Sequence, residues 1–335
     1  MVVRVYLKQA WNLMKQNPLF STLYIVGTGI SIVMTMVIAI VYYVRLAPVY
    51  PETNRMRTLV VKSAKMTNDE STHSSNISYA MLKDWFYSLE SAEVSTGVSG
   101  TSYARVTNDK EEIPTYARYT DENFFRVFPL VFLEGKPFTE ADRRSGIHNV
   151  VLTDSYAQQL FGTTKGVVGK NFLMDYTNVK VVGVVKSGSF LTPDSYAQVY
   201  LPYSCRDGYD DEGSHWALGG YRVYILMKES KSVTDVQDEV LELVRKFNVS
   251  DMGDGWKLDL VGQPELYWHS TFRLWSNVAV DWGRVIWMFV GIFMVLLFVP
   301  AFNLSGMISA RMERQLPDLG IRKAFGASRR RLLVQ

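Results

Sequence analysis

The run Gly166-Val167-Val168-Gly169-Lys170-Asn171 is the nearest approach in this chain to a phosphate-binding loop. Such a loop requires the pattern G-x-x-x-x-G-K-[ST], because its backbone N–H groups cradle phosphates and its hydroxyl reaches magnesium. Thr164 stands where the first glycine is needed, and Asn171 replaces the serine or threonine. The sequence therefore predicts no nucleotide site and no cofactor bound by this chain.

Other residue types that carry chemistry are scattered. No two histidines have a spacing typical of metal ligands; the four are His73, His148, His215 and His269. A cluster of acids lacks the twelve-residue calcium pattern, so a solvated loop is favoured over a weak calcium site; its members are Asp207, Asp210, Asp211 and Glu212. The lone Cys205 is interpreted as an unpaired, buried thiol. No nucleophile elbow is present. We predict that the chain is not an enzyme.

Two long uncharged runs predict membrane-spanning helices. Charges are absent from residues 16–44 and from residues 285–310, and a bilayer core needs about 20 apolar helical residues. We therefore predict spans over 19–45 and 284–309, the second kinked at Pro300. A cleaved signal peptide is the alternative for the first run, although signal hydrophobic regions usually have only about 7–15 residues.

The distribution of positive charge predicts the orientation. Arg4, Lys8 and Lys15 precede the first span without any acid, and seven Lys or Arg residues follow the second span against two acids. By the positive-inside rule, both ends are cytoplasmic and residues 46–283 lie outside the cytoplasm. Residues 1–18 form an amphipathic pattern expected to lie on the cytoplasmic membrane surface. The net charge of +3 is too small to indicate nucleic-acid binding.

The segment between the spans is predicted to be an α+β domain. Its α/β part covers about 50–100 and 216–265, with strand–helix–strand patterns that could share one sheet. These are strands at 57–62, 93–99, 221–227 and 257–261, with helices at 79–91 (capped by Ser78) and about 233–247; residues 63–76 read as a loop. An inserted, mainly β part covers about 101–215, with strands at 116–119, 150–152, 171–174 and 179–185 and a helix at 155–161.

Aromatic residues are dense just before the second predicted span. The simplest interpretation is an interfacial belt on a helical stalk that continues the span. A contact surface for lipid or a peptide is the alternative. The residues are Tyr267, Trp268, His269, Phe272, Trp275 and Trp282.

The central passage reads NVVLTDSYAQQLFG over 149–162 and VVGVVK over 181–186, preceded by FFRVF at 124–128 and LEGKPF at 133–138. This passage resembles the periplasmic core of the MacB/FtsX-like family of ABC transporter permeases. NPLFSTL at 17–23 resembles the start of the family's first helix. DLGIRKAFGAS at 318–328 resembles the cytoplasmic loop of FtsX-like permeases.

The resemblance implies a non-catalytic permease subunit of the inner membrane. Its expected partners are a cytoplasmic ABC ATPase, which supplies ATP hydrolysis, and a second permease copy or a homologous permease. The expected activity is transmission of ATP-driven movement to a periplasmic domain, for export, lipoprotein release or control of other proteins. Family members have four spans, so we expect residues 310–335 to hold a coupling loop and the start of a third span, and the chain to be truncated there.

The final passage is the predicted ATPase-coupling site. Pro317 is expected to end the preceding helix. Apolar residues after it would fill a groove on the ATPase while Arg322 and Lys323 meet acids at its rim; the alternative is that these cations only contact anionic lipid. The site residues are Leu319, Gly320, Ile321, Arg322, Lys323, Ala324, Phe325 and Gly326.

A two-span receptor or sensor with an extracytoplasmic ligand-binding domain is the alternative function. About 27 residues follow the second span, so such a receptor would require a partner to carry the signal inside.

Overall fold

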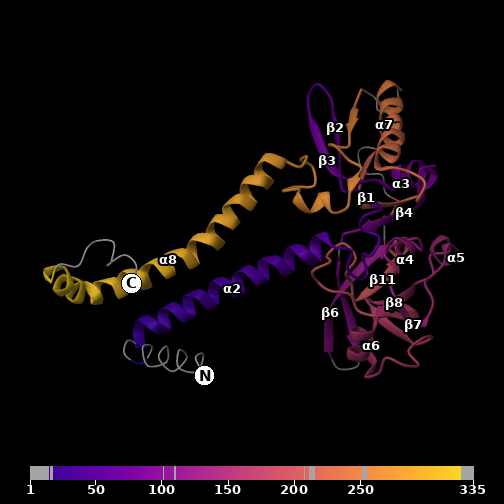
Figure 1. Ribbon diagram of the computed structural model, residues 1–335. Coiled ribbons are helices and arrows are strands. Elements are labelled where there is room, and N and C mark those ends of the chain that lie inside the picture. The colour runs from indigo at the N-terminus through magenta and orange to yellow at the C-terminus, as the bar shows by residue number, and fades with distance from the viewer. Residues whose placement is uncertain are drawn as a thin grey trace. The chain divides into compact units, whose positions relative to one another are not determined.

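The computed structural model in Figure 1 describes residues 15, 18–100, 102–108, 111–206, 208–210, 216–250 and 255–325. The chain divides into two compact units. The helical unit combines Met1–Tyr42 with Trp282–Gln335, and the core unit is Tyr43–Asp281. The amphipathic helix predicted over residues 1–18 lies almost wholly outside the described residues.

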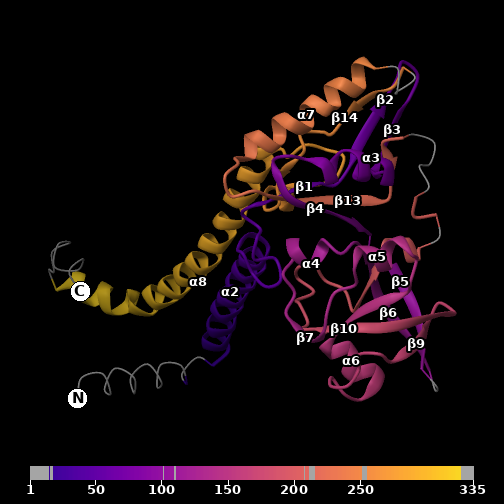
Figure 2. The same ribbon diagram turned by 90° about the vertical axis from the view of Figure 1, so that its right-hand side faces the viewer.

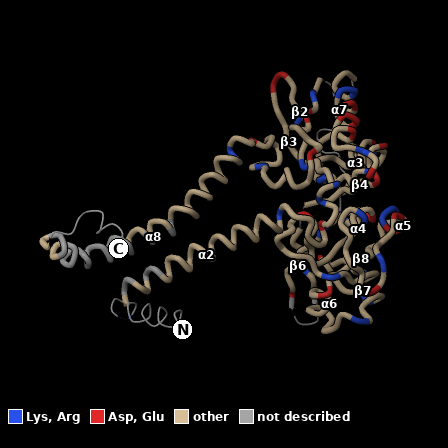
Figure 3. Tube along the Cα trace, in the orientation of Figure 1, with Lys and Arg blue, Asp and Glu red and all other residues tan. Residues whose placement is uncertain are grey.

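Helix α2 (Pro18–Leu46) is apolar enough to cross a membrane over the 22 residues Ile25–Leu46. Large side chains such as those of Ile25 and Met36 are more than half exposed, which suits contact with lipid tails. Ser31 and Thr35 donate their hydroxyls to carbonyls four residues earlier, at 2.9 and 2.8 Å. Both polar groups are therefore satisfied within the helix, as an apolar solvent requires. Figure 3 shows this helix almost free of charge, whereas both signs are interspersed over the core unit.

Helix α8 (Trp282–Ala324) runs for 43 residues through both Pro300 and Pro317. The expected helix end at Pro317 is therefore wrong. A proline removes one hydrogen bond, and a long helix can absorb that loss by bending; Figure 2 shows α8 curved along its length. The apolar segment found within the described part of α8, Trp282–Phe298, is shorter than a full span. A second transmembrane helix thus stays a prediction.

The core unit contains an eight-stranded sheet to which both ends of the unit contribute. Its order is β14-β2-β3-β13-β1-β15, with β12 on β3 and β4 on β13. Strand β13 lies antiparallel to β1 on one side and to β4 on the other, so the predicted sharing of one sheet is confirmed. The bounds are β1 Thr58–Val61, β2 Ala64–Thr67, β3 Thr72–Ile77, β4 Ala92–Ser99, β12 Leu218–Gly219, β13 Tyr221–Met227, β14 Lys257–Asp259 and β15 Glu265–Leu266.

Alternation along β1 and β13 sends side chains to two different cores. Leu59, Val61, Val223 and Ile225 join a cluster with α3 (Tyr79–Asp84) and α7 (Val233–Val249). Val60, Tyr224 and Leu226 face the opposite way, into an aromatic cluster with α4 (Phe124–Val127). The sheet is consequently buried on both faces.

Two local predictions for this part need correction. Residues 63–76 were expected to be a loop but form the hairpin β2–β3, in which Ala64 and Met66 are buried while Lys65 and most of β3 face outward. The helix expected over 79–91 ends at Asp84 and is followed by the 3-10 turn η1 (Phe86–Ser88). Its predicted cap is confirmed, because the Ser78 hydroxyl accepts a hydrogen bond from the Met81 N–H at 3.0 Å.

The inserted part is a seven-stranded sheet in which six strands close into a ring, and the seventh, β7, pairs with β10 outside it. The order is β7-β10-β8-β11-β6-β5-β9, and β9 pairs back onto β10, so the strands surround a buried core that is packed against α6. The bounds are β5 Ser102–Asn108, β6 Glu111–Thr120, β7 Phe132–Gly135, β8 Asn149–Thr153, β9 Asn171–Met174, β10 Thr177–Val185 and β11 Val199–Pro202, with α5 Glu140–Arg144 and α6 Asp154–Phe161.

Close approach of β7 to β10 explains two glycines in the passages that resemble the family. Gly135 has a φ of +71°, and a Cβ on it would lie 2.1 Å from the Val182 carbonyl oxygen. A Cβ on Gly183 would lie 2.7 Å from the Lys136 carbonyl oxygen. Backbone atoms cannot move aside as side-chain tips can, so both positions require glycine.

We expect Gly135→Ala to destabilise the core unit more than Gly146→Ala. Both glycines have positive φ, which costs an L-residue roughly 1–2 kcal/mol, but a Cβ at Gly146 meets nothing within 4 Å. The additional overpacking at Gly135 should lower the free energy of unfolding by about 1–3 kcal/mol more. Denaturation of both variants in detergent, monitored by circular dichroism, measures the difference. Equal losses of free energy of unfolding would show that β7 and β10 can move apart at no cost to admit the added methyl group.

Candidate functional site

The predicted coupling segment forms the end of α8. Leu319 to Ala324 are helical, and the Phe325 N–H donates to the Ile321 carbonyl at 3.1 Å. Ile321 and Phe325 are exposed apolar side chains. Gly326 lies outside the described residues. The segment is thus a helix terminus with apolar side chains available for contact, not a separate loop, and its binding to an ATPase stays a prediction.

Several charged groups that the sequence analysis did not single out are buried in the core unit. Glu52 and Arg55 form an ion pair in which the side chains are 0% and 3% exposed. Glu52 Oε1 accepts hydrogen bonds from the Ser195 hydroxyl at 2.7 Å and the Tyr267 hydroxyl at 2.9 Å. Arg55 Nη1 donates to the Val44 carbonyl at 2.7 Å. This pair therefore joins the last turn of α2, the segment before β11 and the segment after β15.

A second buried carboxylate fixes the same segment before β11. Asp194 accepts from Lys62 Nζ at 3.0 Å and from Arg222 Nη1 at 3.1 Å, so it ties this segment to residues at the end of β1 and in β13. Burial alone would raise the pKa of Asp194, but Lys62 and Arg222 outweigh it and hold that pKa well below its ordinary value. Asp194 is therefore ionised and paired under all ordinary conditions.

Arg118 of β6 completes this attachment. Its side chain is almost fully buried, and Nη2 donates to the Pro193 carbonyl at 2.7 Å and the Tyr196 carbonyl at 3.0 Å. A guanidinium offers five N–H donors in a fixed plane, so one side chain can hold two carbonyls of a turn. Residues 193–196 are consequently held from both sheets.

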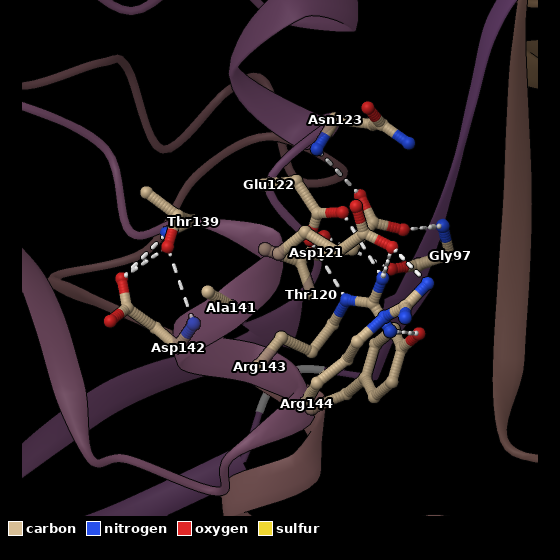
Figure 4. Close-up of polar contacts among 12 residues, drawn as sticks. Gly97, Thr120, Asp121, Glu122, Asn123, Thr139, Ala141, Asp142, Arg143 and Arg144 are labelled. Atoms are coloured by element: carbon tan, nitrogen blue, oxygen red, sulfur yellow. Dashed lines mark hydrogen bonds and ion pairs between the residues drawn. The ribbon is translucent and has the colours of Figure 1, made fainter.

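Asp121, at the end of β6, forms a second connection between the sheets (Figure 4). One carboxylate oxygen accepts from the Thr96 hydroxyl at 2.6 Å and from the N–H groups of Asn123 and Phe124. The other accepts from the Gly97 N–H at 2.9 Å and the Tyr87 hydroxyl at 2.5 Å. Burial raises the pKa of Asp121 to about 6, and the bonds from Thr96, Tyr87 and Gly97 moderate that rise.

The Tyr87 hydroxyl connects Asp121 to a neighbouring ion pair. Tyr87 Oη lies 3.4 Å from Tyr203 Oη, and Arg143 Nη1 donates to Tyr203 Oη at 2.9 Å. Arg143 also pairs with Glu122, Nε to Oε2 at 2.8 Å. Burial raises the pKa of the Tyr87 hydroxyl well above its usual value, with the Asp121 charge adding to the effect. Both tyrosines are therefore neutral hydrogen-bonding links rather than acids.

These groups can hold parts of the core unit in a fixed orientation. Asp121, at the end of β6, bonds to Thr96 and Gly97 of β4. Asp194, before β11, bonds to Lys62 and Arg222, so each of these two carboxylates joins the seven-stranded sheet to the eight-stranded sheet. An arrangement of this kind favours a rigid joint over acid–base chemistry, which would need a group free to exchange a proton with substrate.

The other residues that the sequence analysis considered for chemistry have the following local environments in the structure. Gly166 and Gly169 both have positive φ, in the connection between α6 and β9, and Lys170 Nζ lies 5.1 Å from the centre of the Phe161 ring. Cys205 is half-buried, and burial raises the pKa of its thiol to about 12. Within the described ranges, no three His, Cys, Asp or Glu side chains gather as a metal site would require; His215 is outside those ranges.

The aromatic stretch before α8 differs from the predicted helical stalk. Residues 267–281 form the 3-10 turn η4 (His269–Phe272) and irregular structure, and helix begins only at Trp282. Tyr267 is buried against Tyr224 and Phe128, with ring centres 5.6 and 6.3 Å away. This tyrosine is a core residue because its ring fills the aromatic cluster while its hydroxyl reaches Glu52.

A family model described as the MacB-like periplasmic core domain matches residues 20–243. The chain belongs to this family. It is similar to the macrolide export ATP-binding/permease protein MacB of Escherichia coli K12 and of Shigella flexneri, each 21% identical over 232 residues. The match covers 69% of this chain and 33% of each relative, so the chain spans about a third of the length of the curated relatives it matches.

Solved structures similar to this MacB-family chain include a periplasmic region, an extracellular domain and a domain of a permease protein. The periplasmic region of MacB from Actinobacillus actinomycetemcomitans has a TM-score of 0.42 at 16% identity, covering 59% of this chain and 88% of that one. The extracellular domain of the ABC-type transporter YknZ from Gram-positive bacteria has 0.41 at 16%, covering 59% and 99%. A permease domain from Porphyromonas gingivalis has 0.45 at 17%, covering 61% and 88%.

We expect Arg55→Met to unfold the core unit far more readily than Arg57→Met. Loss of Arg55 leaves the buried Glu52 side chain without its cation, and breaking a buried ion pair in this way typically costs about 3–5 kcal/mol. Arg57 also has two carboxylate partners, Glu93 and Glu229, but it is partly exposed, and exposed pairs contribute only about 0–1 kcal/mol. Chemical denaturation of both variants tests this. Similar midpoints would show that the buried pair contributes no more to stability than the exposed one.

The pKa of Asp121 gives the core unit a pH-dependent stability. The folded pKa of about 6 exceeds the unfolded value of about 3.9, so the folded state binds more protons between these limits. The contribution of Asp121 to stability is therefore greatest below about pH 4 and falls as pH rises to about 6. Thermal melts of wild type and Asp121→Asn across this range should differ in slope, the wild type losing stability relative to the variant as pH rises. Parallel curves would contradict the assignment.

Proposed function

We propose that this chain is a permease subunit of an ABC transporter of the MacB/FtsX type. The observation that carries the proposal is the family match over residues 20–243, which includes α2 and most of the core unit. Relatives with this domain are named as ATP-binding/permease proteins for macrolide export. In this proposal the chain lies in the inner membrane, its core unit is periplasmic, and ATP is hydrolysed by a cytoplasmic partner.

The proposed activity is the transfer of movement from the membrane helices to the periplasmic domain. The last turn of α2, from Tyr43 to Leu46, belongs to the core unit. The Arg55 guanidinium holds that turn through Val44 and is itself paired with Glu52. A displacement of the helix end is therefore expected to carry Ser195 and Tyr267 with it, because both donate to the same carboxylate.

The end of α8 is the proposed contact for the ATPase. Ile321 and Phe325 are exposed, and Arg322 and Lys323 stand between them in sequence. A helix that presents apolar anchors into a groove, with cations at the groove's acidic rim, is a common recognition mode. Dimerisation with a second copy or a related permease completes the proposal and would place two such helix ends in one assembly.

Charge reversal at Arg322 and Lys323 tests the coupling. The double variant Arg322→Glu/Lys323→Glu should lose most of the ABC ATPase that co-purifies with the wild type from native membranes in mild detergent. The control variant Lys83→Glu/Lys165→Glu makes the same charge change at two exposed lysines of the core unit, and it should retain the ATPase. Mass spectrometry of the purified complexes supplies the measurement.

Retention of the ATPase by the Arg322/Lys323 variant would remove the coupling role from this segment. Absence of any ABC ATPase from the wild-type preparation would instead favour the receptor alternative.

A further inference from the structure

The loop between Arg273 and α8 presents apolar side chains outward. Leu274, Trp275 and Val278 are 64%, 67% and 48% exposed. Surface loops are ordinarily polar at such positions, and a gathered set of large exposed apolar residues usually marks an interaction site. The three residues lie within five positions of one another, so the exposure of apolar side chains belongs to the loop as a whole and not to one residue.

The loop is built around the buried guanidinium of Arg273. This group forms an ion pair with Glu265 of β15, and both side chains are almost fully buried. Its Nη1 donates to the Val278 carbonyl at 2.6 Å, and its Nη2 donates to the Val261 carbonyl at 2.9 Å. The Ser63 hydroxyl donates to the Ser276 carbonyl at 2.7 Å. Polar backbone groups thus turn inward while the apolar side chains remain outside.

Chain connectivity keeps this loop near the start of α8. Trp275 precedes Trp282 by seven residues, which span at most about 25 Å even when fully extended. Asp281 is the only charged residue between Arg273 and Arg284. A tryptophan side chain, with an apolar ring and one polar N–H, is favoured at the boundary between hydrocarbon and water.

We infer that the loop Leu274–Val278 inserts into the headgroup region of the periplasmic leaflet of the inner membrane and anchors the core unit to the lipid surface. The inference rests on the proposed function, in which α8 crosses the membrane. Lipid is the occupant that the observations favour, since the loop joins an apolar helix and offers uncharged apolar side chains. The Arg273 charge is already paired, so the contact should not depend on anionic lipid.

Site-directed spin labelling can measure the depth of the loop, because Cys205 is the sole cysteine. On a Cys205→Ser background, labels would be placed by Val278→Cys, by Trp287→Cys within α8 and by Val249→Cys at the exposed end of α7. The full chain in phosphatidylcholine nanodiscs would be examined by power saturation with oxygen, which partitions into lipid, and with a water-soluble nickel chelate.

We expect the ratio of oxygen to nickel accessibility to be highest at position 287, intermediate at 278 and lowest at 249. The ratio at 278 should exceed that at 249 several-fold and remain unchanged when phosphatidylglycerol is added. Adding Leu274→Ser and Trp275→Ser to the 278-labelled protein should lower its ratio to the value at 249, with circular dichroism unchanged.

Two results would overturn the inference, and they differ in what else they reject. A deep label at 287 with an aqueous label at 278 would reject the anchor and leave the spanning α8 intact. An aqueous label at 287 would reject the membrane placement of α8, and with it both the anchor and the proposed topology.

Discussion

The buried pair of Glu52 and Arg55 is the interaction on which the arrangement of the core unit depends. The pair lies only three positions apart in sequence, yet its remaining hydrogen bonds reach the end of α2, the turn before β11 and the segment after β15. A charge taken out of water is tolerated only where it is paired and hydrogen-bonded. The three segments must therefore keep their mutual positions for the pair to remain buried, and this constraint joins the last turn of α2 to the segments before β11 and after β15.

Hydrophobic packing and polar geometry have separate roles at this junction. The aromatic cluster that includes Phe124, Phe128 and Tyr224 lies between the eight-stranded sheet and α4, and burial of such rings supplies most of the attraction. Apolar contact is non-directional, however, and would allow the parts to slide. Asp121, Asp194 and Arg118 add directional bonds from defined donors and acceptors. Directional bonds of this kind fix the relative positions of the groups that they join.

Sequence patterns predicted the regular elements well where local rules apply. Ser78 was identifiable as a helix cap because a serine directly before an apolar helical stripe is a local signal. The hairpin β2–β3 was missed because β3 exposes Thr72 to Ser75, so its strand conformation depends on pairing with β2 and β12. The buried network was missed for a different reason. Glu52 and Ser195 are 143 residues apart, and no local pattern distinguishes them from surface residues.

The aromatic residues before α8 fall into two classes, buried and exposed. The sequence around Tyr267 and Trp275 does not show which of them is buried, since both lie in an aromatic-rich stretch that precedes an apolar helix. Their different exposure arises from the hydrogen-bond partner of the backbone around each residue. The Tyr267 N–H donates to the Thr58 carbonyl at 2.8 Å, which draws this ring into the core beside Glu52. Arg273 then draws the carbonyls of the following turn inward, so Leu274 and Trp275 have to point outward. Two polar anchors therefore separate the two aromatic side chains: the Thr58 carbonyl holds the backbone of Tyr267 at the core, and the Arg273 guanidinium holds the backbone of the turn from which Trp275 projects.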